Sequence, residues 1–266
     1  MHEANEKIMH QGICKLSITP IRAEPNGKSE LLTQLLFGET YKILEQQEEW
    51  IKIETDSDNY SGWMNQNQFY EYTDMGSEMQ IVKKFPMLKS LNLSSNTHVY
   101  LPPGSAIHKY EPTAEGAFFY INNDKFFAAI EDQDIQNINE TNLEAYALQF
   151  LNAPYLWGGK TMLGIDCSGF TQVIYKTMGI QIPRDASQQA EIGEIVTFTN
   201  EAKLGDLAFF ENEQGAITHV GLILRPGEIM HASGKVRCDM LDSYGIYNST
   251  FCKHTHKLRF IKRVLR

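Results

Sequence analysis

The most informative stretch of the chain is residues 163–170, which read Leu163-Gly164-Ile165-Asp166-Cys167-Ser168-Gly169-Phe170. Apolar side chains then recur at helical spacing and share one helix face: Phe170, Val173, Ile174 and Met178. Asp166 is placed to cap this helix, and Gly179 with the later Pro183 marks its end. The pattern predicts a core-packed helix that begins at Cys167.

A cysteine in the first turn of a helix is a candidate nucleophile. The helix N-terminus carries about half a positive charge, which favours thiolate over thiol, and core packing would hold the sulfur still. A nucleophile of this kind needs a base, and His219 lies in an apolar strand pattern at residues 217–224. We therefore expect Cys167 to act with His219.

A second histidine follows on the return strand of a predicted hairpin. Residues 225–228 form the turn, and His231 lies in the strand pattern that follows, where it would orient His219. A two-residue Pro226-Gly227 loop would place His231 on the opposite face of the sheet from His219. The triad hypothesis therefore requires an odd-length loop or a β-bulge.

The same residues also have a structural interpretation. A cysteine early in a helix is more often a small buried apolar side chain than a nucleophile. A single histidine in a strand usually has a structural role as well. The residue patterns alone leave both interpretations open.

Five motifs in order resemble the NlpC/P60 family of cysteine peptidases, at residues 154–159, 166–170, 205–210, 219–221 and 230–234. The similarity covers residues 140–266. It implies an α+β fold with a papain-like catalytic domain, in which the cysteine helix packs on an antiparallel sheet that carries both histidines. It also implies attack on the bond after γ-D-glutamate in peptidoglycan peptides.

The resemblance assigns roles to individual residues. Cys167 would be the nucleophile, His219 the general base and His231 the group that orients it. The backbone N–H of Cys167 would bind the oxyanion, and the Tyr155 hydroxyl would lie near the sulfur unless this ring is only a packed aromatic. Further residues are expected to contact the D-glutamyl part of the substrate: Asp166, Ser168 and Arg184. Ala186 stands where the family often has serine, so one substrate contact is missing or rerouted.

The N-terminal half is predicted to form two small SH3-like β-barrels, at residues 12–74 and 78–137. Residues 50–54 alternate in polarity as a half-buried strand does, and residues 118–130 have a hairpin pattern around residues 122–125. Four segments resemble a bacterial SH3 domain: 22–25, 29–31, 37–39 and 60–63. The whole chain is similar to the γ-D-glutamyl-L-diamino acid endopeptidases, which release L-Ala-γ-D-Glu from murein peptides with a free N-terminal amine.

That similarity implies an ammonium-binding site. Glu30 and Tyr60 stand where these enzymes supply an acid and a phenol, and Asp185 stands where the catalytic domain supplies a second carboxylate. Two carboxylates and a hydroxyl would bind an ammonium through charge-assisted hydrogen bonds. The structural alternative is that Glu30 is a solvated barrel residue and Tyr60 a turn aromatic.

We expect no metal or cofactor, because the family needs none. Cys252, His254 and His256 alternate as zinc ligands on a strand do, but a fourth ligand is not evident and a polar strand face is the simpler interpretation. The four cysteines show no CxxC pair, and a Cys238–Cys252 bridge stays open.

The bulk properties of the chain bear on its partners. Its 266 residues carry a formal net charge of −9, which disfavours nucleic acid as a partner. Apolar runs are too short to span a bilayer, and residues 1–7 lack a signal pattern. We expect a monomer that binds murein peptides in the cytoplasm, or in the periplasm if a signal was removed. Competing hypotheses are an amidase, acyltransferase or peptidoglycan endopeptidase on the same core, and a non-catalytic cell-wall binding protein.

Overall fold

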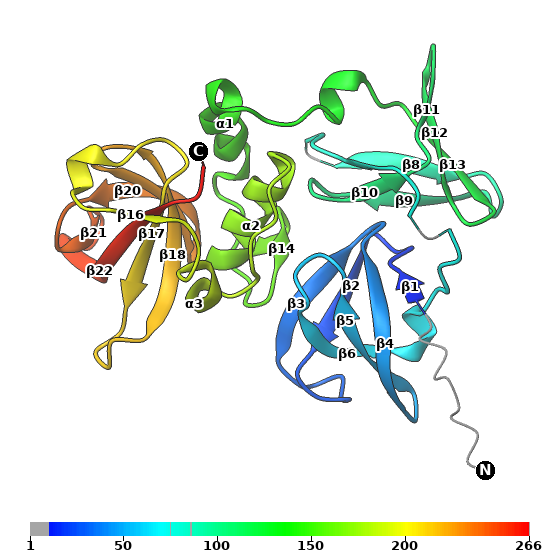
Figure 1. Ribbon diagram of the computed structural model, residues 1–266, viewed down its shortest axis with the longest axis horizontal. Coiled ribbons are helices and arrows are strands. Elements are labelled where there is room, and N and C mark those ends of the chain that lie inside the picture. Colours follow the sequence, from blue (N-terminus) through cyan, green and yellow to red (C-terminus); the bar gives the residue numbers. More distant parts are fainter. Residues whose placement is uncertain (1–10, 75, 86, 266) are drawn as a thin grey trace. The chain divides into compact units, whose positions relative to one another are not determined.

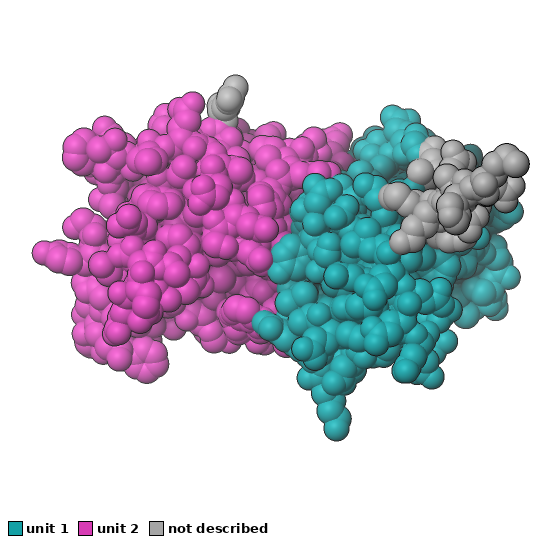
Figure 2. Space-filling view, turned by 60° about the horizontal axis from the view of Figure 1, so that its bottom comes forward, with its two compact units in different colours: residues 1–82, 87–134 teal, residues 83–86, 135–266 magenta. Residues whose placement is uncertain are grey.

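The computed structural model describes residues 11–74, 76–85 and 87–265. Residues 1–10, which include the stretch without a signal pattern, lie outside the described residues. The chain divides into two compact units, shown in two colours in Figure 2. Unit 1 comprises residues 1–82 and 87–134, and unit 2 comprises residues 83–86 and 135–266.

Unit 1 begins with a six-stranded antiparallel barrel-like sheet in the order β1-β4-β5-β6-β2-β3 (Figure 1). In β5 every second side chain is buried, which confirms the strand predicted from the alternation of residues 50–54. Its elements are β1 (Gln11–Ile13), β2 (Ile18–Arg22), β3 (Leu31–Leu36), β4 (Thr40–Gln47), β5 (Trp50–Thr55), β6 (Ser61–Asn65) and the 3₁₀ turn η1 (Gln66–Gln68).

The rest of unit 1 contains a two-stranded and a five-stranded sheet, with strand orders β10-β7 and β11-β12-β13-β8-β9. The predicted hairpin is confirmed, since Ile121 pairs with Asp124 across a two-residue turn in which Asn122 has φ 49°. The elements are β7 (Met79–Ile81), β8 (Leu88–Asn92), β9 (Thr97–Leu101), β10 (Ala106–His108), β11 (Glu111–Thr113), β12 (Gly116–Ile121), β13 (Asp124–Ala128) and η2 (Asp132–Asp134).

A tight backbone contact joins the two halves of unit 1. The backbone of Gly38 has φ +78°, and a Cβ on it would lie 1.8 Å from the carbonyl oxygen of Ala106. The Nε2 atom of His108 bonds to the Gly38 carbonyl oxygen at 2.8 Å. Next to it, the fully buried Phe37 ring packs edge-on against Phe126 at 5.4 Å. Only glycine fits position 38, because both the φ angle and the space exclude a side chain.

Unit 2 contains three α-helices and a seven-stranded antiparallel sheet in the order β16-β22-β17-β18-β19-β20-β21, within the described residues. Strand β21 also pairs with β22, which closes the sheet on itself. The elements are α1 (Glu140–Ala147), η3 (Leu148–Phe150), β14 (Lys160–Thr161), β15 (Gly164–Ile165), α2 (Cys167–Thr177), α3 (Ala186–Gln189), β16 (Glu194–Val196), η4 (Thr199–Glu201), β17 (Leu207–Glu211), β18 (Ile217–Arg225), β19 (Glu228–Ser233), β20 (Lys235–Leu241), β21 (Gly245–Asn248) and β22 (Lys253–Arg263).

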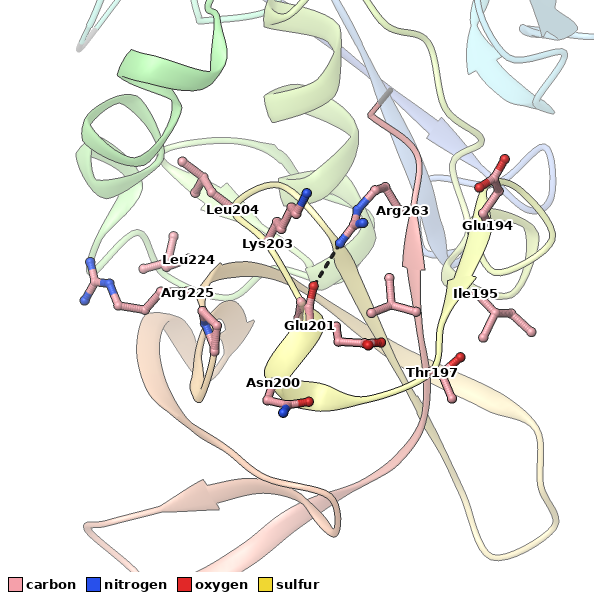
Figure 3. Close-up of a pocket in the computed structure, with 13 residues that line it drawn as sticks. Glu194, Ile195, Thr197, Asn200, Glu201, Lys203, Leu204, Leu224, Arg225 and Arg263 are labelled. Carbon is pink, nitrogen blue, oxygen red and sulfur yellow. Dashed lines mark hydrogen bonds between the residues drawn. The ribbon is translucent and has the colours of Figure 1, made fainter.

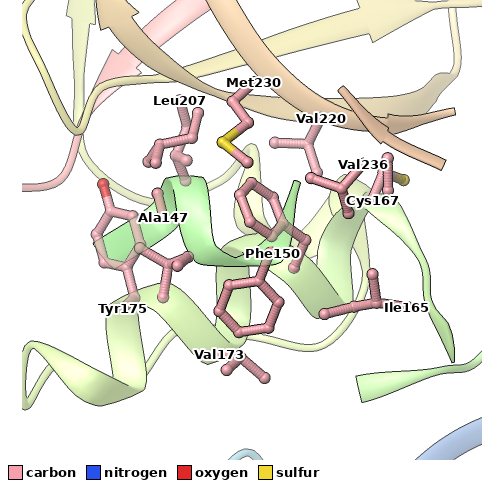
Figure 4. Packing of buried hydrophobic residues seen from close by; sticks show 14 of the residues in the cluster. Ala147, Phe150, Ile165, Cys167, Val173, Tyr175, Leu207, Val220, Met230 and Val236 are labelled. Atoms are coloured by element: carbon pink, nitrogen blue, oxygen red, sulfur yellow. The ribbon is translucent and has the colours of Figure 1, made fainter. Parts of the chain in front are cut away.

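Helix α2 packs on β18 and β19, as predicted for a cysteine helix on an antiparallel sheet with both histidines. Figure 4 shows this core, in which Val173 and Tyr175 lie on the helix side and Val220 and Met230 lie on the sheet side. The helix ends where the sequence indicated, since its last residue is Thr177 and Gly179 follows with φ +82°. The packed core therefore fixes the position of the first helical residue, Cys167.

A β-bulge in β18 brings the two histidines to one face of the sheet. Next to the two-residue turn Arg225 pairs with Glu228, but beyond the bulge Leu222 pairs with Met230. This one-residue shift turns the side chains of β19 to the other face, so His231 lies on the same face of the sheet as His219. The triad hypothesis required such an irregularity. Gly221 leaves room there, because a Cβ on it would lie 2.9 Å from the Cβ of His231.

None of the helices within the described residues is long and apolar enough to cross a membrane.

Replacing Gly38 by alanine is expected to destabilise unit 1. The new Cβ would meet the Ala106 backbone at a positive φ, so we expect a loss of at least about 2 kcal/mol in the free energy of unfolding. Urea unfolding in a W157F background, followed by the fluorescence of Trp50 and Trp63, measures it. Gly27→Ala is the matched control, because a Cβ there meets nothing within 4 Å. Equal midpoints for the two variants would refute this packing argument.

Candidate active site

Cys167 is the first residue of α2, and it is 6% exposed. Burial raises the pKa of its thiol to about 11, and the nearby Asp166 carboxylate raises it further. The backbone N–H groups of Val220 and Ser168 and the charge of Arg184 act in the opposite direction. Burial therefore opposes the thiolate that the helix N-terminus is expected to favour.

The sulfur lies beside the strand that carries His219. The N–H of Val220, the next residue along β18, bonds to the Cys167 side chain. Burial lowers the pKa of His219 well below its usual value, and the neighbouring His231 and His256 lower it further. Both pKa shifts favour the neutral forms, a thiol and an uncharged imidazole.

His219 and His231 are joined by a hydrogen bond of 2.8 Å between Nε2 of His219 and Nδ1 of His231. Both rings are buried and stand nearly perpendicular, at 87°. Because Nε2 of His219 is engaged, Nδ1 is the ring nitrogen that remains to accept a proton. The structure thus brings together the two histidines predicted from the sequence.

The sequence analysis missed Asp239, on the neighbouring strand β20. Its Oδ2 lies 3.0 Å from Nε2 of His231 and 2.6 Å from Nε of Arg237, and its Oδ1 accepts from Nη2 of Arg237 at 2.8 Å. Burial raises the pKa of Asp239, but the hydrogen bonds from His231 and Arg237 outweigh it and hold the pKa below its usual value. Strand alternation could have indicated Asp239. Arg237 pairs with His231, and Asp239 lies two residues further along β20, so its side chain is on the same face as that of Arg237.

His256 on β22 was also missed as a neighbour of the base. Its ring stacks on His219 with centroids 4.2 Å apart and planes 27° apart. Its pKa falls to about 4, chiefly because of burial and also because of His231, while Asp239 acts in the opposite direction. The Thr255 hydroxyl lies 2.9 Å from its Nδ1 atom.

The zinc alternative is not supported, because the three side chains have separate surroundings. His254 bonds to Asp242 at 2.9 Å, His256 stacks on His219, and the Cys252 sulfur lies 3.4 Å from the backbone oxygen of Ser249. No cluster of three possible metal ligands occurs among the described residues. Cys238 and Cys252 are both free thiols, which excludes the bridge left open by the sequence.

Tyr155 is held in a loop beside the sulfur. Its backbone N–H donates to the Gly234 carbonyl oxygen at 3.1 Å, and it forms a parallel bridge with Ile165. Burial raises the pKa of its hydroxyl to about 12, and Cys167 is the next largest contributor. The charge state of Cys167 therefore affects the Tyr155 hydroxyl.

Asp166, Ser168 and Arg184 form one buried cluster at the start of α2. Arg184 donates from Nη2 to Asp166 at 2.6 Å and from Nη1 to the Ser168 hydroxyl at 2.8 Å, and it is 1% exposed. Asp166 also accepts from the backbone N–H groups of Gly158 at 2.8 Å and Gly169 at 2.6 Å. Because these contacts occupy both Asp166 oxygens, we assign it a supporting role instead of the expected substrate contact.

The remaining predicted residues lie in two places. Asp185 is the N-cap of α3 and forms a capping box with Gln188. Glu30 and Tyr60 lie in unit 1, directly before β3 and β6, and both strands run antiparallel to β2. Glu30 and Tyr60 therefore lie at the same end of the first sheet, where Glu30 is exposed and Tyr60 half-buried.

A hollow of about 740 Å³ elsewhere on unit 2 has no catalytic constellation (Figure 3). It lies at the end of β18 remote from His219, next to Leu224 and Arg225. Arg225 pairs with Glu144 and Glu228, and Arg263 pairs with Asp206 at 2.7 Å. Since Arg225 and Arg263 are paired with carboxylates of the chain itself and Cys167, His219 and His231 do not line the hollow, it is not the site of the chemistry.

Comparison with known proteins agrees with this geometry. A model described as the NlpC/P60 family matches residues 152–255, and one described as the bacterial dipeptidyl-peptidase SH3 domain matches residues 21–69. A γ-D-glutamyl-L-lysine dipeptidyl-peptidase of Bacillus subtilis is 32% identical over 217 residues, which are 75% of this chain and 71% of that protein. The Bacillus cereus enzyme of the same name is 30% identical over 229 residues, which are 77% and 68%.

A crystal structure of an NlpC/P60 family protein from Bacillus cereus has the same fold. Its TM-score with this chain is 0.83 at 21% identity, and the alignment covers 96% of this chain and all of the other. The two dipeptidyl-peptidase relatives and the family model indicate an enzyme and not a non-catalytic binding module. The chain belongs to the NlpC/P60 family, and it is a hydrolase of the cysteine peptidase class with an N-terminal SH3-like domain.

Proposed function

We propose that the chain hydrolyses the bond between γ-D-glutamate and the L-diamino acid in murein peptides with a free N-terminal L-alanine, releasing L-Ala-γ-D-Glu. The observation that supports it best is the buried thiol of Cys167 against β18, the strand that carries His219, together with the hydrogen bond between His219 and His231. The names of two relatives that match about three quarters of this chain point to the same bond.

In this proposal the sulfur of Cys167 attacks the γ-carbonyl carbon as Nδ1 of His219 takes the thiol proton. Since the thiol is neutral at rest, proton transfer accompanies the attack instead of preceding it. The tetrahedral oxyanion would be bound by the backbone N–H of Cys167, at the start of α2, and by the Tyr155 hydroxyl.

The next steps return the site to its starting state. The imidazolium of His219 gives its proton to the leaving amine, the C–N bond breaks, and the product peptide departs with a thioester left on Cys167. Water then attacks the thioester carbon while His219 takes its proton and returns it to the sulfur. L-Ala-γ-D-Glu leaves with a free γ-carboxylate, so one water is consumed for each bond cut.

Substrate contacts belong to the same proposal. Ser168 and Arg184 are proposed to meet the α-carboxylate of the D-glutamyl residue, because this buried pair supplies a hydroxyl and a cation beside the nucleophile. Ala186, the first residue of α3, lacks a hydroxyl for a further contact. Glu30, Tyr60 and Asp185 are proposed to recognise the substrate ammonium, for which carboxylates and a phenol oxygen are suitable acceptors.

We also propose that residues 78–137 are a second SH3-like module. Its support is the five-stranded antiparallel sheet β11-β12-β13-β8-β9, with the β10-β7 pair, that follows the first barrel. The matched SH3 model ends at residue 69, so this assignment depends on the strand arrangement.

The first prediction concerns the bond and the free amine. Wild type is expected to release L-Ala-γ-D-Glu from L-Ala-γ-D-Glu-L-Lys but not from its N-acetylated form, as measured by mass spectrometry. Cys167→Ala should release nothing. Glu30→Gln should weaken the preference for the free amine about tenfold or more, because a charge-assisted contact is lost.

Glu49→Gln, in the turn between β4 and β5, is the matched control and should behave like wild type. Equal cleavage of both peptides by wild type would refute the recognition of the ammonium by Glu30, Tyr60 and Asp185. It would leave the assignment of Cys167 as the nucleophile intact. Cleavage of intact peptidoglycan and not of the tripeptide would favour an endopeptidase.

The second prediction follows from the thiol pKa of about 11. Because the raised pKa keeps the thiolate fraction small at neutral pH, alkylation of Cys167 by iodoacetamide should accelerate about tenfold per pH unit from pH 7 to 10. Peptide mass spectrometry measures the rate, with the exposed Cys252 as an internal reference. A rate that levels off below pH 8 would instead show a thiolate–imidazolium pair at rest.

A further inference from the structure

We propose that Asp239 is a positioning residue that sets the tautomers of both histidines, so that Nδ1 of His219 is the unprotonated nitrogen available to the thiol. The proposal rests on the catalytic roles proposed for Cys167 and His219. It concerns a residue outside the cysteine and the two histidines that the family motifs contain.

Two hydrogen bonds connect the Asp239 carboxylate to His231 and His231 to His219. An ionised carboxylate only accepts, so the contact of 3.0 Å requires a proton on Nε2 of His231. In a neutral ring Nδ1 of His231 is then an acceptor, and the contact of 2.8 Å requires a proton on Nε2 of His219. A neutral His219 therefore has no proton on Nδ1, which is the form that a general base needs.

Arg237 keeps Asp239 in the accepting form. Its guanidinium contacts both carboxylate oxygens, at 2.6 Å and 2.8 Å, and the Asp239 side chain is 3% exposed. The carboxylate is thus surrounded by donors, with Arg237 on one side and His231 on the other. A carboxamide at this position would have to direct an N–H group at one of these donors or force His231 into the other tautomer.

Other groups around the pair do not set the tautomers. Asp239 of β20 contacts His231, His256 of β22 stacks on His219, and Arg237 of β20 contacts Asp239. Phe210 of β17 adds an apolar ring beside His219. His256 contacts the face of His219, not its edge, so it holds the ring plane without exchanging a ring proton with it. Among the described residues, the hydrogen bonds of the ring nitrogens lead from His219 through His231 to Asp239.

The first test is on the unmodified protein and needs no substrate. In ¹⁵N-histidine-labelled wild type, nitrogen shifts near pH 8 should show protonated Nε2 and bare Nδ1 for both His219 and His231, with assignments from single His→Gln variants. A protonated Nδ1 on His219 would overturn the proposal whatever any Asp239 variant does.

The second test is Asp239→Asn, which preserves size but adds donors. We expect kcat to fall by about 10² to 10⁴, as when a buried carboxylate behind a catalytic histidine is amidated, with KM changed less than about threefold. The variant should also show Nδ1–H on His219, which would donate to the sulfur, favour the thiolate and so speed alkylation of Cys167 at pH 9. A kcat within threefold of wild type, in a variant with wild-type thermal stability, would overturn the proposal.

Asp242→Asn is the matched control, because Asp242 also accepts from a histidine, His254, at 2.9 Å, but at an exposed site outside this chain of contacts. It should leave kcat, the ring tautomers and the alkylation rate unchanged. The tautomer and alkylation results stand even if the tripeptide is not cut, so failure of the proposed substrate is distinguishable from failure of the role of Asp239.

Discussion

The carboxylate of Asp166 joins the three segments from which the nucleophile side of the site is built. It accepts from the Gly158 N–H in the loop that carries Tyr155, from the Gly169 N–H at the start of α2, and from the buried guanidinium of Arg184. Removing one partner of such a buried pair leaves an uncompensated charge and costs about 3–5 kcal/mol. The positions of loop, helix and α3 segment are therefore interdependent.

Much of the site follows from local sequence rules. The helix from Cys167 to Thr177 has a capping aspartate, an apolar stripe and a terminal glycine, so its start is set by neighbours in sequence. The bulge before Arg225 was predictable from the alternation of side chains along the two strands. A two-residue turn without a bulge would place His219 and His231 on opposite faces of the sheet. Here a functional hypothesis predicted a structural irregularity.

The missed residues depend on pairings that local rules do not set. Asp239 comes near His231 only through the register of β19 with β20, and His256 reaches His219 only because β22 pairs with both β17 and β21. A bulge between Ile246 and Tyr247 also shifts the partners of β22, so alternation alone grouped His256 with His254 incorrectly. Long-range strand order decides such contacts, and a single sequence does not carry it.

The burial that fixes these groups also limits their reactivity at rest. The same apolar packing that orders Cys167 raises the pKa of its thiol to about 11 and lowers that of His219, so the charged pair is disfavoured without substrate. Charge then develops during the attack itself, when the oxyanion and the imidazolium of His219 form together. The hydrogen bonds from His219 to His231 and from His231 to Asp239 stabilise that imidazolium. In such a site the fixed direction of the His219 lone pair matters more than a high basicity, because the base acts only when the carbonyl is in place. The hydrogen bonds from Asp239 through His231 to His219, with Arg237 holding the carboxylate, would fix that direction without adding charge at the sulfur.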